Sequence, residues 1–330
     1  MKPISTLGLV LVLLLPALSA SAQKVGTTSM QFLKVAPSAR AMSMGTAYAA
    51  IAGGTDALYW NPAGLTRTQG HALSLDHVDW FMDAAHYGFA YGGSFGNWGY
   101  LGVHVYVADM GEFDETRVDH LGFVDRNGQQ VYNPGLTGET FSAQSWVVGL
   151  TYARKFTDRF SAGLSAKYAR EDLWLEAAGA PLFDFGMTYE TGFRSVRLGA
   201  SVQNFGPTIS FAEADNDAPL LFRIGAAVDL LGGDALTPFG NADNRLTASY
   251  DLIQPNDYDQ QWAAGVEYAF LDRFMLRGGY QHNFDTASFS FGAGVRQPFG
   301  NIGLGLDYAY SDMTEDFGAV HRFGVQFSFE

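Results

Sequence analysis

Apolar and polar residues alternate along most of the chain after residue 70. Near the C-terminus, Ile302, Leu304 and Leu306 alternate with Gly303 and Gly305. Successive side chains of a strand point to opposite faces, so each such strand has one apolar face and one face of small or polar residues. This dyad pattern is typical of strands in an outer-membrane barrel, where the apolar face meets lipid.

The same pattern recurs in fourteen segments. They span residues 71–81, 85–95, 98–108, 141–155, 159–170, 178–190, 193–205, 219–230, 245–254, 261–270, 273–283, 287–298, 301–311 and 318–329. Most are long enough to cross a bilayer at a tilt, which takes roughly 9–11 residues, and their number is even. The sequence therefore predicts a 14-stranded antiparallel transmembrane β-barrel over residues 71–330. A soluble β-sandwich is the alternative, although sandwiches rarely need so many long strands with so little charge.

Connection lengths test this prediction independently. With both chain ends in the periplasm, periplasmic connections such as Gly96-Asn97 and Leu271-Asp272 are short, whereas Asp109 to Thr140 and Gly206 to Ala218 form long external loops, as such barrels require. One connection, Leu231 to Asn244, is long on the periplasmic side. Either a strand is misplaced there or this periplasmic loop carries something.

The first 22 residues have the features of a cleaved signal peptide. Lys2 supplies a positive charge, Leu7 to Leu15 form an apolar stretch, and Ala20-Ser21-Ala22 resembles a cleavage site, the three parts of an export signal. A membrane anchor is the alternative, but the apolar run is shorter than the ~20 residues of a spanning helix. We expect export through a cleaved signal peptide to the bacterial cell outer membrane.

Composition agrees with a barrel and excludes other classes of protein. Charged residues make up 16% of the chain, against a usual ~25%, while aromatics reach 15% and there are 39 glycines. The chain has no cysteine, which excludes thiol catalysis and disulfides. Its net charge of -14 argues against nucleic acid as a partner, because nucleic acid attracts basic surfaces.

Residues 23–70 lack the strand pattern and carry a familiar motif. The run from Phe32 to Gly45, FLKVAPSARAMSMG, and the run from Ala57 to Leu65, ALYWNPAGL, resemble the N-terminal signature of PorV/PorQ-type outer-membrane proteins. These belong to a wider FadL-like group of barrels. The resemblance implies a hatch, residues 23–70, folded inside a fourteen-stranded barrel.

The same resemblance implies two possible functions. In PorV, a component of type IX secretion, the barrel binds the C-terminal domains of secreted cargo and hands them on to other secretion-system proteins. In FadL-type transporters the hatch gates the passage of hydrophobic small molecules. We take the secretion component as the main hypothesis and uptake of a hydrophobic small molecule as the alternative; in both, the barrel also contacts outer-membrane lipid.

The hatch contains the first candidate site, formed by Asn61, Pro62, Ala63 and Gly64. Proline forces the preceding residue out of the helical region, and asparagine can bond to nearby backbone, so this stretch forms a fixed turn. The resemblance implies that the turn lies in the lumen and acts as a gate. An ordinary turn between hatch and barrel is the alternative.

Charged residues on the small-residue face of the strands form the second candidate site. They are His104, Lys167, Arg197, Arg223, Asp229, Asp251, Glu267, Arg277, Asp307 and Arg322. Barrel interiors are usually polar and buried charges are normally paired, so we expect ion pairs that hold the hatch. The alternative is a route for an amphipathic ligand whose carboxylate meets Arg197, Arg223 or Arg277.

The longest external loop is the third candidate site. Phe113, Leu121, Phe123 and Tyr132 place apolar anchors among charges there. Under the secretion hypothesis this loop binds the partner protein.

Signals for catalysis or metal binding are weak. Gly92-Gly93-Ser94-Phe95-Gly96 matches G-x-S-x-G, but it lies between two strands and lacks the helix that such a nucleophile elbow needs. The histidines lack H-E-x-x-H spacing, and the acidic loops lack the regular spacing of a calcium loop. We predict a non-enzymatic protein with no catalytic residue, metal or cofactor, although a hydrolase with a triad drawn from separate strands stays open.

Overall fold

The computed structural model describes residues 27–35, 37–211, 214–233, 235–237, 243–284, 287–313 and 318–329. The expected signal peptide, residues 1–22, lies outside the described residues. Within the described part of the chain, no helix is both long and apolar enough to span a membrane.

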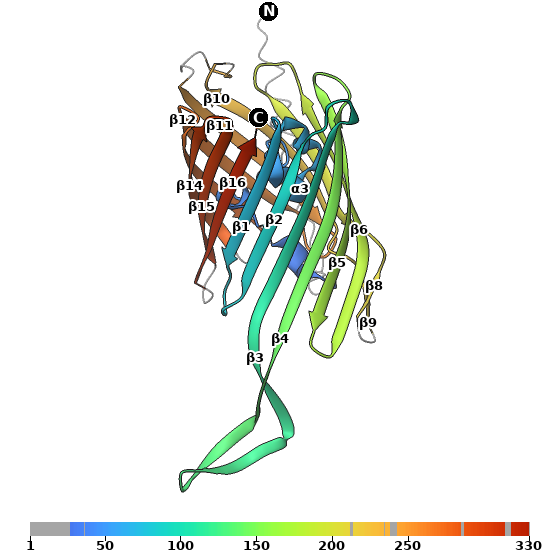
Figure 1. Ribbon diagram of the computed structural model, residues 1–330, viewed down its shortest axis with the longest axis vertical. Helices are drawn as coiled ribbons and strands as arrows, with labels where there is room; N and C mark the ends of the chain where they lie inside the picture. Colours follow the sequence, from blue (N-terminus) through green and yellow to red (C-terminus); the bar gives the residue numbers. More distant parts are fainter. Residues whose placement is uncertain are drawn as a thin grey trace, which may run out of the picture.

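Fourteen antiparallel strands close into one barrel, in which β1 pairs with β16 (Figure 1). The strands are β1 (His71–Asp79), β2 (Ala85–Ser94), β3 (Tyr100–Arg126), β4 (Gln129–Lys155), β5 (Phe160–Leu173), β6 (Glu176–Glu190), β7 (Arg197–Phe205), β10 (Leu221–Leu231), β11 (Asn244–Pro255), β12 (Gln261–Phe270), β13 (Phe274–His282), β14 (Ala287–Phe299), β15 (Ile302–Met313) and β16 (Ala319–Phe329). The predicted fourteen-stranded barrel is confirmed, and most predicted strand ends lie within a few residues of those observed.

The outer face of the barrel is apolar. Leu150 and Leu276 are 66% and 64% exposed on it, whereas Thr151 and Arg277, which follow them in the chain, are buried. A closed sheet pairs all its backbone groups internally, and an apolar outer wall can face hydrocarbon. The architecture is therefore that of an outer-membrane β-barrel.

The two ends of the barrel differ. We call the end where β1 begins and β16 ends the termini end, and the opposite end the hairpin end, because the β3–β4 hairpin projects far beyond the barrel there (Figure 1). Near the hairpin end, an aromatic ladder crosses four strands on the outer face through Tyr250, Trp262, Tyr280 and Phe289, with ring centroids 5.9, 5.4 and 4.9 Å apart. Such a ladder suits a membrane interface.

The hairpin corrects the predicted external loop, Asp109 to Thr140. There, β3 and β4 stay paired until Arg126 meets Gln129, across a two-residue turn of Asn127 and Gly128. Both turn residues have positive φ, 56° and 80°, and Asn-Gly is the sequence signal for such a turn. The sequence pattern does not predict these strands because the ribbon is exposed on both faces, so nothing imposes apolar–polar alternation on it.

Two other connections also differ from expectation. The predicted loop Gly206 to Ala218 contains a small two-stranded sheet of β8 (Ile209–Phe211) and β9 (Ala214–Asn216). The long connection from Leu231 to Asn244 does not hide a misplaced strand, because β10 and β11 are direct neighbours in the barrel; part of this connection lies outside the described residues.

Residues 27–35 and 37–70, which we call the inner segment, fold inside the barrel (Figure 1). It contains five short helical turns: η1 (Gln31–Lys34), α2 (Ala39–Ser43), η2 (Gly54–Asp56), α3 (Ala57–Trp60) and η3 (Pro62–Arg67). The Ser38 hydroxyl caps α2 by accepting from the backbone N–H of Ala41 at 3.3 Å, as N-cap serines do. The segment is rich in alanine, glycine and methionine, so it fits within the lumen.

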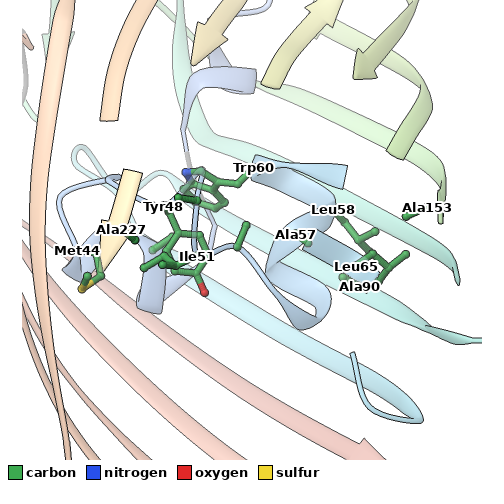
Figure 2. Close-up of a cluster of buried hydrophobic side chains, with 13 residues drawn as sticks. Met44, Tyr48, Ile51, Ala57, Leu58, Trp60, Leu65, Ala90, Ala153 and Ala227 are labelled. Atoms are coloured by element: carbon green, nitrogen blue, oxygen red, sulfur yellow. The ribbon is translucent and has the colours of Figure 1, made fainter. Parts of the chain in front are cut away.

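The inner segment has a core of its own that is completed by the wall (Figure 2). Tyr48 packs edge-on to Trp60, with ring centroids 5.8 Å apart. Leu65 lies toward Ala90 of β2, a wall residue of the same cluster. Because the wall contributes small residues, the inner segment can approach it closely.

Candidate functional site

Asn61 ties the inner segment to the barrel wall at the predicted gate. Its side chain is buried, and its Nδ2 donates to the carbonyls of Ala49 at 2.9 Å and of Met187 in β6 at 3.0 Å. Its Oδ1 accepts from the N–H of Ala63 at 3.2 Å, which caps η3, and Pro62 begins that turn. The N–H of Gly64 donates to the Asn61 carbonyl at 2.8 Å. The four predicted gate residues therefore lie together, and all are buried.

Glycines in the wall allow this close contact. A Cβ added to Gly186 of β6 would lie 2.1 Å from Asn61 Oδ1, and one added to Gly279 of β13 would lie 2.0 Å from the backbone nitrogen of Gly45. Real Cβ atoms do not approach other atoms so closely, so the wall has no room for a side chain at these points. The part of the inner segment around Gly45 and residues 61–66, which we call its base, is thus fastened by its own backbone.

Glu267 of β12 is the centre of a buried ion network. Its carboxylate accepts from Arg277 Nε at 2.7 Å, from Arg40 Nε at 3.1 Å and from Arg245 Nη1 at 3.3 Å. Arg40 belongs to α2, so this network joins the inner segment to the wall. Breaking one partner of such a buried group leaves an uncompensated charge, which is strongly destabilising.

The predicted luminal charges are mostly used in such pairs. Arg277 also contacts Asp307 at 2.7 Å, and Arg197 contacts Asp229 at 2.6 Å. Arg223 and Asp251 are different: both are buried, but neither forms an ion pair within the described part of the chain.

Side chains, rather than closely fitted backbone, hold the other end of the inner segment. Asp257, in the turn between β11 and β12, accepts from Lys34 Nζ at 2.6 Å, from Thr28 Oγ1 at 2.5 Å and from Gln31 Nε2 at 3.0 Å. Burial by itself raises the pKa of Asp257, but the hydrogen bonds from these three groups and the charge of Lys34 outweigh it, so the pKa lies below its usual value. This contact, which we call the Lys34–Asp257 tether, lies at the hairpin end.

Two cavities adjoin the inner segment near the hairpin end. The larger, about 260 Å³, is lined by apolar residues such as Trp80 and Phe284 and by polar groups that include Arg223. The smaller, about 50 Å³, lies against Tyr59 and His104. Lys34, Val35, Leu221 and Arg223 line both cavities. A mostly preformed cavity with apolar walls and a few polar groups is what small-molecule sites look like.

The predicted partner loop is a projecting ribbon. Phe123 and Tyr132 are directly paired across it and lie 71% and 56% exposed. Leu121 and Phe113 are also exposed, and Phe113 stacks on Phe141 with ring centroids 5.5 Å apart. The structure brings these four residues onto one hairpin but not onto one compact patch.

Sequence reasoning missed Lys34, Arg40 and Asp257. They lie in the inner segment or in a turn, where no periodicity marks which way a side chain points. Lys34 and Arg40 stand inside the run from Phe32 to Gly45, so the motif itself was the available signal.

The described residues do not form a site that would strengthen the weak sequence signals for catalysis or metal binding. Ser94 ends β2 and is followed only by a single turn, η4 (Gly96–Trp98), before β3. Among the described residues, no cluster of histidine and acidic side chains could hold a metal ion.

Comparison with known proteins gives structural matches only. No family model matches the chain, and no curated protein matches it. Similar solved structures include the toluene transporter TbuX of Ralstonia pickettii, with 13% identity, a TM-score of 0.55 and coverage of 88% of this chain and 97% of that one. The Pseudomonas putida toluene transporter TodX has 13% identity and a TM-score of 0.52, with 87% and 95% covered. A FadL homologue from Pseudomonas aeruginosa has 11% identity and a TM-score of 0.51, with 86% and 95% covered.

Identities this low establish the fold alone. They do not show that the chain is related to PorV/PorQ proteins or takes part in type IX secretion, as the N-terminal motif suggested. The chain has the fold of a FadL-like outer-membrane β-barrel.

Proposed function

We propose that the protein is an outer-membrane channel for hydrophobic small molecules, with the inner segment as its hatch. The observation that carries this proposal is the cavity of about 260 Å³ between the hairpin end and the inner segment. The packed core of Tyr48, Trp60 and Leu65 lies inside the barrel beyond it. The fold shared with toluene transporters supports this function over a secretion role.

The orientation follows from the two ends. We place the hairpin end outside the cell and the termini end in the periplasm, since long extensions of such barrels face outward. A solute entering from outside reaches the cavity first and the hatch core second. Passage then requires part of the hatch to move.

The moving part of the hatch is its hairpin-end portion, including η1. This portion is held by the Lys34–Asp257 tether and by a bond from the Met30 N–H to Glu171 Oε2 at 3.1 Å. The stretch from Asn61 to Gly64, by contrast, is locked against wall glycines. We assign to these four residues the role of fixing the closed position of the hatch.

The test measures uptake of radiolabelled toluene by Gram-negative cells carrying the protein, because their lipopolysaccharide leaflet slows passive entry. The chain has no cysteine, so engineered pairs are unique. Thr28→Cys with Asp257→Cys places two thiols across the tether. Thr66→Cys with Ser161→Cys places two at the base, where the native hydroxyls are 3.1 Å apart.

A short, reducible thiol cross-linker then distinguishes the two ends of the hatch. We expect cross-linking at the tether to stop uptake and reduction to restore it, while cross-linking at the base leaves uptake unchanged. Toluene uptake no greater than in cells lacking the protein would refute the transport function. Equal effects of the two cross-links would refute only the placement of the moving part.

Secretion is the second candidate function, and the projecting hairpin favours it. Phe113, Leu121, Phe123 and Tyr132 are exposed apolar residues on a ribbon that contributes nothing to closing the barrel. Affinity isolation of the tagged protein from its own outer membrane tests this function. Copurified exported proteins with a shared C-terminal domain, lost when residues 112–142 are replaced by a short turn, would support secretion; an isolated barrel would count against it.

A further inference from the structure

We propose that the larger cavity binds a small amphipathic anion, with its carboxylate on Arg223 and its apolar part against Trp80 and Phe284. This inference rests on the proposed channel function and specifies the class of solute. The proposed ligand is not a pure hydrocarbon, because a hydrocarbon would leave the buried cationic donor of the cavity without a hydrogen-bond partner.

Arg223 has an unused hydrogen-bond donor at this place. Its Nε donates to Gln203 Oε1 at 3.0 Å, but its Nη1 is buried without any partner. The residue is only 7% exposed. A buried charged donor without a partner costs several kcal/mol, so an anionic acceptor at Nη1 would recover that loss.

The charge of the lining points the same way. The residues that line the two cavities include Lys34, Lys167, Arg223 and Arg322 but no aspartate or glutamate. Lys34 and Lys167 already contact Asp257 and Asp184, at 2.5 and 2.7 Å. Arg322 lies over the Trp80 ring, 5.6 Å from its centroid, and donates to Ser311 Oγ at 3.2 Å. In a chain of net charge -14, an acid-free cavity is an exception, and Arg223 is the lining cation with a buried donor that has no partner.

Asp251 is the nearest competing acceptor for Arg223. It faces the lumen from β11, where it pairs with Gly225, two positions along β10 from Arg223. Its Oδ2 accepts from the backbone N–H groups of Tyr48 and Ala49, both at 2.9 Å. Its Oδ1 lies over Gly225, where an added Cβ would be 2.1 Å away. One oxygen of Asp251 therefore serves the inner segment, while Oδ1, like Arg223 Nη1, is buried without a hydrogen-bond partner; within the described part of the chain the two residues are too far apart to form an ion pair.

The rest of the lining fits the apolar part of such a molecule. Trp80, Phe284, Leu221 and Met313 contribute aromatic and aliphatic surface to the cavity. Its volume of about 260 Å³ is just below the ~300–1,000 Å³ of typical small-molecule pockets. A single aromatic ring with a carboxylate fits these dimensions, whereas a long acyl chain exceeds them.

Three probes of nearly equal shape test the proposal on the purified full-length protein. Benzoate carries the carboxylate, benzamide replaces it with a neutral amide, and toluene replaces it with a methyl group. Isothermal titration in detergent or lipid discs measures the dissociation constant of each. We expect benzoate to bind about 10–100-fold more tightly than benzamide, the usual range for a charge-assisted bond to a buried group.

Variants locate the effect on Arg223. In Arg223→Met the preference for benzoate over benzamide should disappear, while Arg223→Lys should retain part of it, because lysine keeps the charge but not the planar fork. Arg296→Met is the matched control: Arg296 also faces the lumen, but it contacts Asp307 and lines neither cavity. That variant should keep the full preference.

A structural role for Arg223 is tested separately with Asp251→Asn. If Arg223 only neutralises Asp251, Arg223→Met should lower the unfolding temperature, the double variant should restore it, and the benzoate preference should not change. That result would overturn the proposal, as would equal affinity of the wild type for benzoate and benzamide. Both outcomes are independent of toluene uptake, which tests the channel function; benzoate binding without toluene uptake would leave the anion site in place.

Discussion

The two ends of the inner segment are attached to the barrel in different ways. At its base, Asn61 and Gly45 press their backbone or short side chains against wall glycines, with no room for a single added carbon. Near the hairpin end, Thr28, Gln31 and Lys34 reach one carboxylate, that of Asp257, beside two cavities. The attachment at the base is steric, because backbone is packed directly against glycine. The attachment near the hairpin end depends on a few side-chain hydrogen bonds.

This difference is consistent with the proposed channel function of a barrel whose lumen holds a folded segment. Tight backbone packing fixes where the hatch sits, and the buried network around Glu267 reinforces it. Side-chain bonds at the hairpin end, each contributing on the order of 1 kcal/mol, can break and re-form on the time scale of solute passage. Variants that weaken one attachment without the other can separate the two roles.

The largest effect should come from the ion network. Glu267→Gln removes the charge that holds Arg40, Arg277 and Arg245, so we expect a loss of about 3–5 kcal/mol in the free energy of unfolding. Denaturant unfolding in lipid vesicles measures it. Glu190→Gln is the control, because Glu190 contacts Arg67 at 2.9 Å but is 45% exposed, and such pairs contribute less than about 1 kcal/mol. Equal losses for the two variants would contradict the network's role.

The next effect should come from wall glycines. Gly279→Ala would place Cβ 2.0 Å from the Gly45 nitrogen, and we expect a loss of about 1–3 kcal/mol from overpacking, with raised ion conductance as the hatch is displaced. Gly278→Ala is a neighbouring control, since its Cβ would meet only Phe291 at 3.8 Å. Planar-bilayer conductance and thermal unfolding compare the pair. A Gly279→Ala variant with unchanged unfolding temperature and unchanged conductance would show that the base is not held sterically.

The Lys34–Asp257 tether should respond to mutation and pH more weakly. Lys34→Met should lower the amide-exchange protection of residues 28–34 about fivefold, which corresponds to ~1 kcal/mol for a bond from a lysine whose side chain is 26% exposed. The base, residues 61–66, should keep its protection. Mass spectrometry of exchanged peptides measures both, and unchanged protection at residues 28–34 would contradict the tether.

Acid should weaken the same tether. The pKa of Asp257 is lower in the folded protein than in the unfolded chain, so its contribution is complete above the unfolded value of about 3.9. It is lost as the pH falls through the lower, folded-state pKa. Protection of residues 28–34 should therefore fall only in strong acid, and Asp257→Asn should abolish this pH dependence. If protection began to fall near neutral pH, the pH dependence would have to come from a group other than Asp257.

The smallest effect on the barrel should come from the hairpin. Replacing residues 112–142 with a short turn removes pairs that lie beyond the barrel. We therefore expect an unfolding temperature within a few degrees of the wild type and unchanged toluene uptake, measured by calorimetry and the cell assay. A large drop in stability would show that the ribbon folds back on the barrel.

Much of the barrel could be predicted because lipid imposes a strict rule on each strand. Every second residue must be apolar, and this holds from β1 to β16 wherever the wall meets hydrocarbon. Outside the membrane this alternation is not required. The pattern therefore predicts a loop where the outer parts of β3 and β4 lie, although Asn127-Gly128 marks their turn. The inner segment has no such rule, and only its resemblance to known barrels indicated a hatch.

The ion pairs show the same division between sequence and structure. Glu267 and Arg277 were predicted to face the lumen from neighbouring strands, but the predicted turn Leu271-Asp272 would place Leu276 opposite Glu267; the observed register places Arg277 there, and its Nε donates to Glu267. Arg40, 227 residues away from Glu267, meets the same carboxylate only because the inner segment folds into the lumen.

The sequence by itself determined the barrel, its strand number, and which residues face inward, because these depend on local periodicity and on the solvent outside. The tertiary structure decided how the inner segment sits, which glycines admit it, and that the buried Arg223 Nη1 has no hydrogen-bond partner, whereas Arg197, Arg277 and Glu267 form ion pairs. Those features depend on the closure of the barrel around a segment without periodicity, which brings distant parts of the chain within hydrogen-bond distance.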